Sequence, residues 1–195
     1  MNNIYIKDTI EKSIGTKKLL LESEECISAI YNLASKCLES LRNGGKIILA
    51  GNGGSFGDAQ HISAEFTSRF LFDRKPLASI ALGTNSSSMT AIGNDYGYEN
   101  VFSRELEGIG DKKDVFIPIT TSGNSKNIIE AIKVANKKNI TTIGLTGSNN
   151  GLINKMCECI CVPSEDTGRI QECHILIGHI FCAMVEKSYF KDKSS

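Results

Sequence analysis

Five short segments, apolar and rich in β-branched residues, recur along the chain and constrain its fold more than any other feature. Such segments are typical of strands buried on both faces of a parallel sheet. Helical patterns lie between most of them, so helices must cross over the sheet to join the strands. We therefore predict an α/β fold with a five-stranded, doubly wound parallel sheet and helices on both faces. The predicted strands are Lys46–Gly51, Leu77–Gly83, Asp114–Thr120, Thr141–Gly147 and Cys159–Pro163.

Two long helical patterns, about Ser23–Leu41 and about Arg169–Phe190, flank this sheet. They carry more apolar surface than five strands need, so we expect them to pack against another subunit. No linker or composition shift divides the chain, so we expect a single domain over residues 1–195. Residues 1–44 would form N-terminal oligomerisation helices, and residues 45–190 the sheet core and the C-terminal helix.

The balance of charge excludes some classes of partner. Lys and Arg together number 22, as do Asp and Glu. A chain without a basic excess is not expected to bind nucleic acid or an acidic membrane surface. The seven cysteines lack framework spacing and are typical of reduced thiols. With no signal sequence and no apolar run long enough for a membrane span, we expect a cytoplasmic protein.

Small polar residues and glycines follow the first three predicted strands. Carboxyl ends of parallel strands meet at one edge of a sheet, where such folds bind ligands. Backbone N–H groups, hydroxyls and helix dipoles there would suit a phosphate. Ser and Thr before a helix are also common N-caps, so each loop alone has a purely structural interpretation. The candidate residues are Asn52, Gly53, Gly54 and Ser55 after the first strand, Asn94 and Asp95 after the second, and Thr120, Thr121, Ser122 and Ser125 after the third.

Nucleotide-binding patterns fit this chain poorly. Gly51, Gly53 and Gly57 are spaced one residue off the dinucleotide fingerprint, and the second strand ends without an acidic residue for a ribose. The phosphate-binding motif of the P-loop NTPases is missing as well. The loops therefore favour a smaller phosphate-bearing ligand.

Two pairs of residues could hold a metal ion or act on a substrate. His61 and Glu65 are four residues apart, on one face of the helix after the first strand. Gln171 and His179 are a little over two turns apart on the last helix and project to roughly one side. A histidine on a helix is more often structural, and we interpret His174 in that way.

Three alternating cysteines, Cys157, Cys159 and Cys161, share one face of the last predicted strand. Zinc knuckles use C-x-x-C spacing, whereas this segment is C-x-C-x-C. Small thiols also fill tight contacts between sheets and helices. We interpret these cysteines as packing residues.

Four separated motifs together resemble the sugar isomerase (SIS) family and, within it, the phosphoheptose isomerases. They are "AGNGGSFGDAQHISAEFTSRF", "AIGNDYGYENVFSRE", "TTSGNSKNIIEAI" and "DTGRIQECHILIGHIFC", and the resemblance runs from about Lys46 to Glu186. It implies a single SIS domain of the flavodoxin-like type. It also implies isomerisation of sedoheptulose 7-phosphate to glycero-manno-heptose 7-phosphate, the first step towards heptose for lipopolysaccharide or capsule. A cytoplasmic homotetramer with one zinc ion per subunit and active sites at subunit interfaces is further implied.

The resemblance also assigns roles to positions. His61, Glu65, Gln171 and His179 match the metal-binding positions, and the loop residues named above match substrate-contacting ones, with Glu65 and Gln171 among them. Glu65 would be the catalytic base and His179 its acid–base partner. Two positions depart from the pattern: Thr120 stands where Ser is frequent, and Gly168 where some members have an acidic residue.

Two other functions remain open. The resemblance extends to some relatives with the same fold that are non-catalytic, tetrameric scaffolds binding the replication initiator, but that branch lacks the acidic residue at the Glu65 position and the histidine at the His179 position. A phosphosugar sensor, which would bind its ligand without changing it, is the second alternative.

Overall fold

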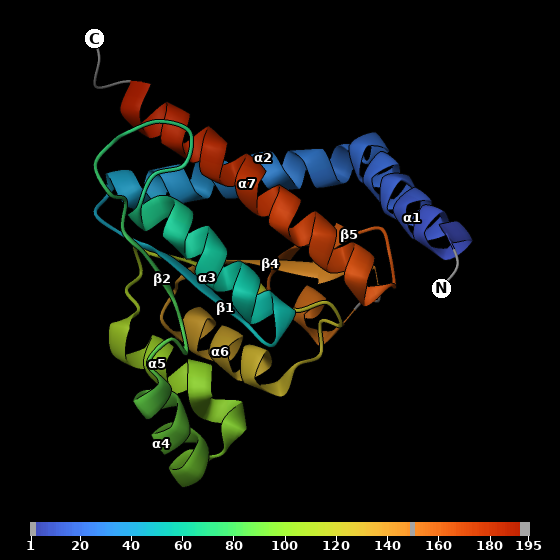
Figure 1. The fold of residues 1–195 in the computed structure, drawn as a ribbon. Coiled ribbons are helices and arrows are strands. Elements are labelled where there is room, and N and C mark those ends of the chain that lie inside the picture. Colours follow the sequence, from blue (N-terminus) through green and yellow to red (C-terminus); the bar gives the residue numbers. More distant parts are fainter. Residues whose placement is uncertain (1–2, 149–150, 192–195) are drawn as a thin grey trace.

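A computed structural model describes residues 3–148 and 151–191 (Figure 1). The ends of the proposed domain, residues 1–2 and 192–195, lie outside the described part. The helices are α1 (Asn3–Glu22), α2 (Glu24–Arg42), α3 (Gly54–Thr67), α4 (Ser86–Tyr96), α5 (Val101–Ile109), α6 (Lys126–Lys137) and α7 (Thr167–Lys191), with short 3₁₀ helices at Tyr98–Asn100 and Leu152–Lys155. The strands are β1 (Ile47–Gly51), β2 (Ser79–Ala81), β3 (Val115–Ile119), β4 (Thr141–Gly147) and β5 (Glu158–Val162).

All five strands pair in parallel, in the order β2-β1-β3-β4-β5. This is the flavodoxin-like order, in which the chain changes direction across the sheet between β1 and β3. The structure confirms the predicted fold class. The crevice beyond the carboxyl ends of β1 and β3 is the place where folds of this order bind ligands.

Each face of the sheet contributes to its own hydrophobic core. Ile47 and Leu49 of β1 pack with residues of α2, α3 and α7 on one face. Ile48 and Ala50, which alternate with them, pack with residues of α5 and α6 on the other. Helices therefore cover both faces, and α3 and α7 lie side by side on the first (Figure 1).

Several element bounds differ from the sequence-based prediction. β2 is confined to Ser79–Ala81, shorter than the predicted Leu77–Gly83. α7 runs from Thr167 to Lys191, slightly beyond the predicted Arg169–Phe190 at both ends. The N-terminal region holds two helices, because Ser23 starts a new helix by accepting a hydrogen bond from the Cys26 N–H.

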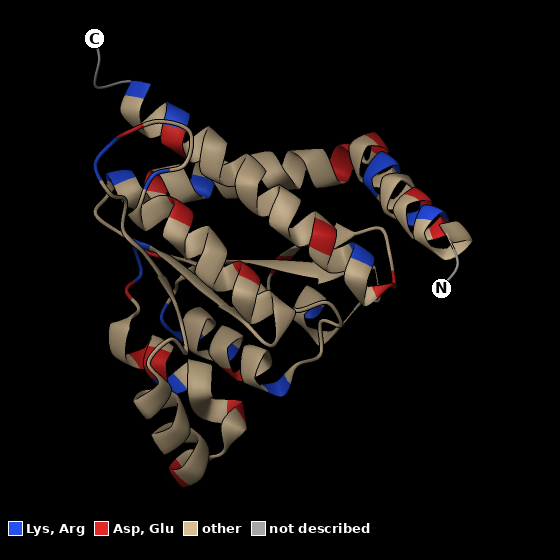
Figure 2. Cartoon of the chain, viewed as in Figure 1, with Lys and Arg blue, Asp and Glu red and all other residues tan. Residues whose placement is uncertain are grey.

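Charged residues of both signs are interspersed along the elements (Figure 2). Within the described part of the chain, no helix combines the length and apolarity needed to cross a bilayer.

A buried ion pair fastens the segment between α3 and β2 to the C-terminal helix. Glu186 on α7 accepts hydrogen bonds from Arg74 Nε at 2.8 Å and from the N–H groups of Phe70 and Leu71 at 2.9 and 2.7 Å. The Arg74 and Glu186 side chains are only 2% and 1% exposed. The Arg74 guanidinium also donates to three carbonyls at the end of α3, those of Glu65, Phe66 and Ser68.

Glu186→Gln should destabilise the fold strongly. The amide keeps the size of the side chain but loses the charge and turns an NH₂ group towards N–H donors. Removing one partner of a buried ion pair lowers the free energy of unfolding by about 3–5 kcal/mol. Each kcal/mol lost lowers the Tm of a chain of this size by roughly 2–4 °C. Glu130→Gln is the matched control, because its pair with Lys133 is largely exposed and worth at most about 1 kcal/mol. Equal unfolding midpoints for the two variants in urea would mean that the buried pair stabilises the fold no more than the exposed one.

Candidate active site

Helix α7 has a glycine, Gly178, at its point of contact with α3. A Cβ atom placed on Gly178 would lie 2.7 Å from Cδ1 of Ile62 on α3, closer than carbon atoms can pack. The absent side chain thus lets the α3 residues around Ile62 face the α7 residues around Gly178. The neighbours of these two contact residues are His61 and His179.

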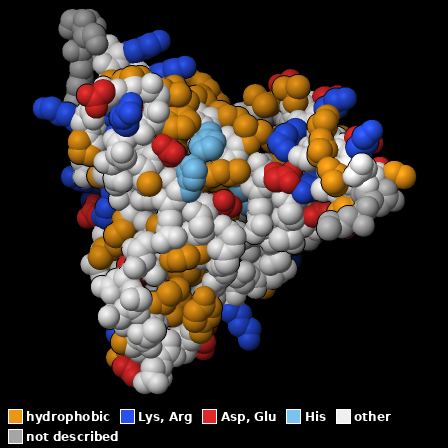
Figure 3. Space-filling model, in the orientation of Figure 1, with side chains coloured by type: hydrophobic (Ala, Val, Ile, Leu, Met, Phe, Trp, Pro, Cys, Tyr) orange, Lys and Arg blue, Asp and Glu red, His pale blue; other side chains and the backbone are white. Residues whose placement is uncertain are grey.

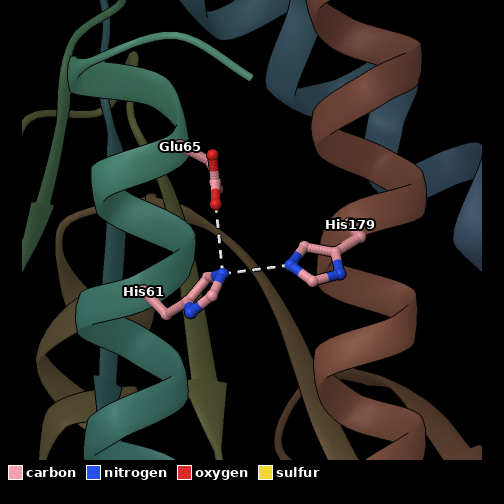
Figure 4. A group of neighbouring side chains, drawn as sticks. All are labelled: His61, Glu65 and His179. Atoms are coloured by element: carbon pink, nitrogen blue, oxygen red, sulfur yellow. Dashed lines mark hydrogen bonds and ion pairs between the residues drawn. The ribbon is translucent and has the colours of Figure 1, made fainter. Parts of the chain in front are cut away.

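His61, Glu65 and His179 converge between the two helices (Figure 4). The Nε2 atom of His61 lies 3.1 Å from Oε1 of Glu65 and 3.0 Å from Nε2 of His179. One ligating atom from each residue falls within 4.8 Å of the others. The sequence predicted the first pair from its spacing, and the fold brings His179 to it from 118 positions away.

This donor set fits a metal ion. Two imidazole nitrogens and a carboxylate oxygen lie within 4.8 Å of one another. Two neutral imidazoles can share only one hydrogen bond through facing nitrogens, whereas a cation between them satisfies both. His and carboxylate ligands in a group of three also leave a coordination position for a substrate.

The group lies at the surface, at the seam between α3 and α7. The His61 side chain is 49% exposed and that of Glu65 22%. Figure 3 shows histidine side chains at this seam with hydrophobic side chains around them. The Phe70 ring stacks on His179, with centroids 5.4 Å apart and planes inclined by 21°. Burial raises the pKa of Asp58, one turn before His61 on α3, while His61 acts in the opposite direction.

Gln171 meets α3 at its first residue. A Cβ atom on Gly54 would lie 2.6 Å from the Gln171 Nε2 atom, so the Gln171 side chain rests against the start of α3. It lies on the same seam as His179, two turns earlier on α7. The role of Gln171 as a metal or substrate ligand stays a prediction.

Two helix N-termini lie at the switch point without a side-chain cap. The N-cap residues are Gly53 for α3 and Ser125 for α6, and neither makes a side-chain capping bond. The hydroxyl of Ser125 instead lies 3.1 Å from that of Thr120. The simple capping interpretation of these loops is therefore wrong for both helices. Uncapped N–H groups and the helix dipoles make this edge of the sheet suitable for an anion.

An amide pair joins the two loops. The side-chain amides of Asn52 and Asn127 exchange hydrogen bonds of 2.9 and 2.8 Å, and the Tyr98 hydroxyl donates to the side-chain oxygen Oδ1 of Asn52. Asn127 is 3% exposed, so the link is shielded from water. Asn52, predicted to contact substrate, therefore also links the loop after β1 to the start of α6.

The remaining loop residues differ in accessibility. Ser55 and Thr120 are buried, whereas Thr121 is half-buried and Ser122 is exposed. Ser122 Oγ accepts a hydrogen bond from the Asn124 N–H, which fixes the turn before α6.

Asn94 and Asp95 do not join the group of three. They lie on α4, exposed to solvent, and Asn94 Nδ2 donates to Asp95 Oδ1 at 2.8 Å. In Figure 1, α4 and α5 form the lower end of the molecule, well away from α7. Their assignment to the substrate site stays a prediction.

His174 has the structural character that its position on the last helix predicted. The ring is fully buried, and Nε2 lies 3.2 Å from the Thr146 carbonyl oxygen. Burial lowers the pKa of His174 to about 4. It therefore stays neutral at neutral pH.

Sequence reasoning missed the residues that support the site. Asn127, Phe70, Arg74 and Glu186 act through contacts with residues far away in the chain. One signal was available: Asn127, a polar residue, falls on the apolar stripe that Ile128 and Ala131 also occupy at the start of α6.

Known proteins resemble the chain in sequence and in structure. A family model described as the SIS domain matches residues 16–147. A phosphoheptose isomerase of Aneurinibacillus thermoaerophilus is 54% identical over 192 residues, which are 98% of this chain and 97% of the relative.

Two solved structures agree with this. A phosphoheptose isomerase from Francisella tularensis superposes with a TM-score of 0.91 at 33% identity, covering 96% of this chain and 100% of that one. A phosphoheptose isomerase from Neisseria gonorrhoeae superposes with a TM-score of 0.89 at 39% identity, covering 95% of this chain and 98% of that one. The chain therefore belongs to the SIS domain family and, within it, to the phosphoheptose isomerases.

Proposed function

We propose that this chain interconverts sedoheptulose 7-phosphate and D-glycero-D-manno-heptose 7-phosphate. The observation that carries the proposal is the convergence of His61, Glu65 and His179 beside two uncapped helix N-termini. Catalysis on a phosphosugar needs acid–base groups at the reacting carbons and a separate binding site for the phosphate. Family membership and the name of its relatives supply the identity of the sugar.

The spacing of the site suits an extended sugar phosphate. The phosphate would bind to the Gly53–Ser55 and Thr120–Ser125 loops. His61 is seven positions after Gly54 on α3, which is about 10 Å along the helix axis. The carbonyl end of the same molecule would then lie beside His61, Glu65 and His179.

The reaction moves two protons. Glu65 takes a proton from C1 of the ketose as O2 gains one, which gives an enediol. O1 then loses its proton, and C2 receives one, which leaves an aldehyde at C1. Oε1 of Glu65 faces His61 and the other oxygen points away from it, free to carry the C1 proton (Figure 4). His179 would move the proton between O1 and O2, with Phe70 holding its ring.

We also propose that His61, Glu65 and His179 hold one zinc ion per subunit, with Gln171 as a weaker oxygen ligand. The donor set on α3 and α7 supports this assignment. A bound zinc ion would polarise the sugar carbonyl and favour removal of the neighbouring proton.

The assembly that we propose is a homotetramer with active sites at subunit interfaces. Ile6, Ile10 and Ile14, spaced by one turn on α1, are 56%, 55% and 48% exposed. An apolar stripe of this size on a helix favours burial against a second copy of the chain. The exposure of His61 supports a site that a neighbouring subunit helps to close.

In the cell, we propose that the enzyme acts in the cytoplasm. Its product would be the first intermediate towards nucleotide-activated heptose for lipopolysaccharide or capsule.

Glu65→Gln and His179→Gln should each lower kcat about 10²–10⁴-fold, the usual contribution of a positioned acid or base. Conversion of sedoheptulose 7-phosphate to the aldose can be followed by NMR. Metal analysis of each variant separates the roles, because a variant that keeps its zinc but not its turnover has lost a catalytic group. A variant that loses both its zinc and its turnover has lost a metal ligand.

Two controls accompany these variants. Glu130→Gln on α6 makes the same chemical change at an exposed position and should leave kcat unchanged. His174→Gln should keep most of its kcat and lose stability, because the His174 ring is buried away from the seam. Near-normal turnover by Glu65→Gln would remove that residue from the mechanism.

The double variant Ser122→Ala with Ser125→Ala should raise KM and leave the fold intact. Each lost hydrogen bond to a charged phosphate is worth roughly 1.5–3 kcal/mol. The matched control is Ser28→Ala with Ser35→Ala on α2, which should keep the wild-type KM. An unchanged KM in the first variant would exclude the loop before α6 from substrate binding.

Ile10→Glu together with Ile14→Glu should shift the protein to a smaller species in sedimentation velocity. The new carboxylates on the apolar stripe of α1 would lose their water of hydration in an interface, which opposes assembly. Lys12→Glu changes the charge elsewhere on the same exposed helix and should leave the assembly intact. A wild-type protein that sediments as a monomer at micromolar concentration would contradict the proposed assembly.

A further inference from the structure

Two thiols lie side by side at the start of β5. The Sγ atoms of Cys157 and Cys159 are 3.8 Å apart. Cys157 precedes the strand, where the chain bends into it, so the two side chains approach each other more closely than their spacing in a regular strand would allow. The contact between the sulfurs lowers the pKa of Cys157 and raises that of Cys159.

The neighbouring strand leaves room for this pair. Gly144 of β4 is the register partner of Cys159. A Cβ atom on Gly144 would lie 3.0 Å from Cys159 Sγ, 3.1 Å from Cδ1 of Ile153 and 3.6 Å from Cys157 Sγ. The two sulfurs thus share a space above a strand that has no side chain there, with Ile153 beside them.

Cys157 and Cys159 are more exposed to solvent than residues of the core. Both cysteines are half-buried at the edge strand of the sheet, while Ile160 and Val162 point into the core. The packing interpretation from sequence therefore accounts for only part of the environment of these two residues.

The distance between the sulfurs has a chemical meaning. Two thiolates bound to one tetrahedral zinc ion, each at about 2.3 Å, lie about 3.8 Å from each other. The thiols already have this separation. A disulfide would need the sulfurs to approach to about 2.0 Å, so an ion between them requires far less movement of the chain.

We propose that Cys157 and Cys159 chelate a soft cation of the zinc and cadmium class, at a second site independent of the His61 group. The cysteines pack against the core on the α5–α6 face of the sheet, whereas His61 lies on α3 on the opposite face. Thiolates are the ligands that such ions prefer, and water would complete the coordination. Binding converts two thiols and one divalent ion into a dithiolate complex and releases two protons.

Cadmium titration of the reduced full-length protein tests the proposal. Thiolate bound to cadmium gives an ultraviolet charge-transfer band, which nitrogen and oxygen ligands of the His61 group do not produce. The wild-type band should saturate at one cadmium ion per chain. Cys157→Ser and Cys159→Ser should each weaken the affinity reported by the band at least about tenfold, or abolish it.

Cys161→Ser is the matched control, because Cys161 is the next thiol on the same face and its sulfur accepts a hydrogen bond from Asn154. It should keep the wild-type band and affinity. A wild-type protein without the band, or a band that survives in both Cys157→Ser and Cys159→Ser, would overturn the proposal. Circular dichroism of each variant shows that the comparison is made between folded proteins.

Discussion

The close approach of α3 and α7 is the contact on which the rest of the site depends. Helices in proteins usually pack with their axes 8–10 Å apart, depending on the side chains between them. Gly178 contributes no side chain to this interface, and Ile62 fills the space. A bulkier residue at 178 would have to displace the Ile62 side chain or push the helices apart, and a shift of the helices would separate His61 from His179. Displacements of about 1 Å in a catalytic site can cost about 10²-fold in rate, so this glycine sets the geometry of the chemistry.

The Arg74–Glu186 pair is costly to bury, and its surroundings explain why the fold tolerates it. The two side chains also bond to the backbone. The Glu186 carboxylate accepts from the N–H groups of Phe70 and Leu71, and the Arg74 guanidinium donates to carbonyls at the end of α3. The same bonds fix the backbone of Phe70, whose ring lies on His179. Ionic stabilisation of the core and orientation of a site histidine thus depend on one network.

Much of the fold could be predicted from sequence because its signals are local. The apolar, β-branched segments predicted the strands, and the helical patterns between them predicted a parallel sheet covered on both faces, whereas the flavodoxin-like type was implied by the family resemblance. The His61–Glu65 spacing fixed two members of the site, since both lie on one helix. His179 was a candidate from its spacing to Gln171, but only the family resemblance joined it to His61 and Glu65, because no spacing rule places α7 against α3. The short β2 and the Asn52–Asn127 pair depend on tertiary contacts that no sequence window contains.

The use of α7 for one half of the site has a consequence for the newly made chain. The sheet strands and α3 are all synthesised before residue 167, so much of the core precedes the last helix. Domains begin to fold from the N-terminus during translation. A chain without α7 therefore contains the loops after β1 and β3 and His61, but lacks His179 and the α7 side chains that complete the core on that face of the sheet. The site becomes complete only at the end of synthesis, and a premature stop before α7 leaves a protein without half of the helical seam that holds it.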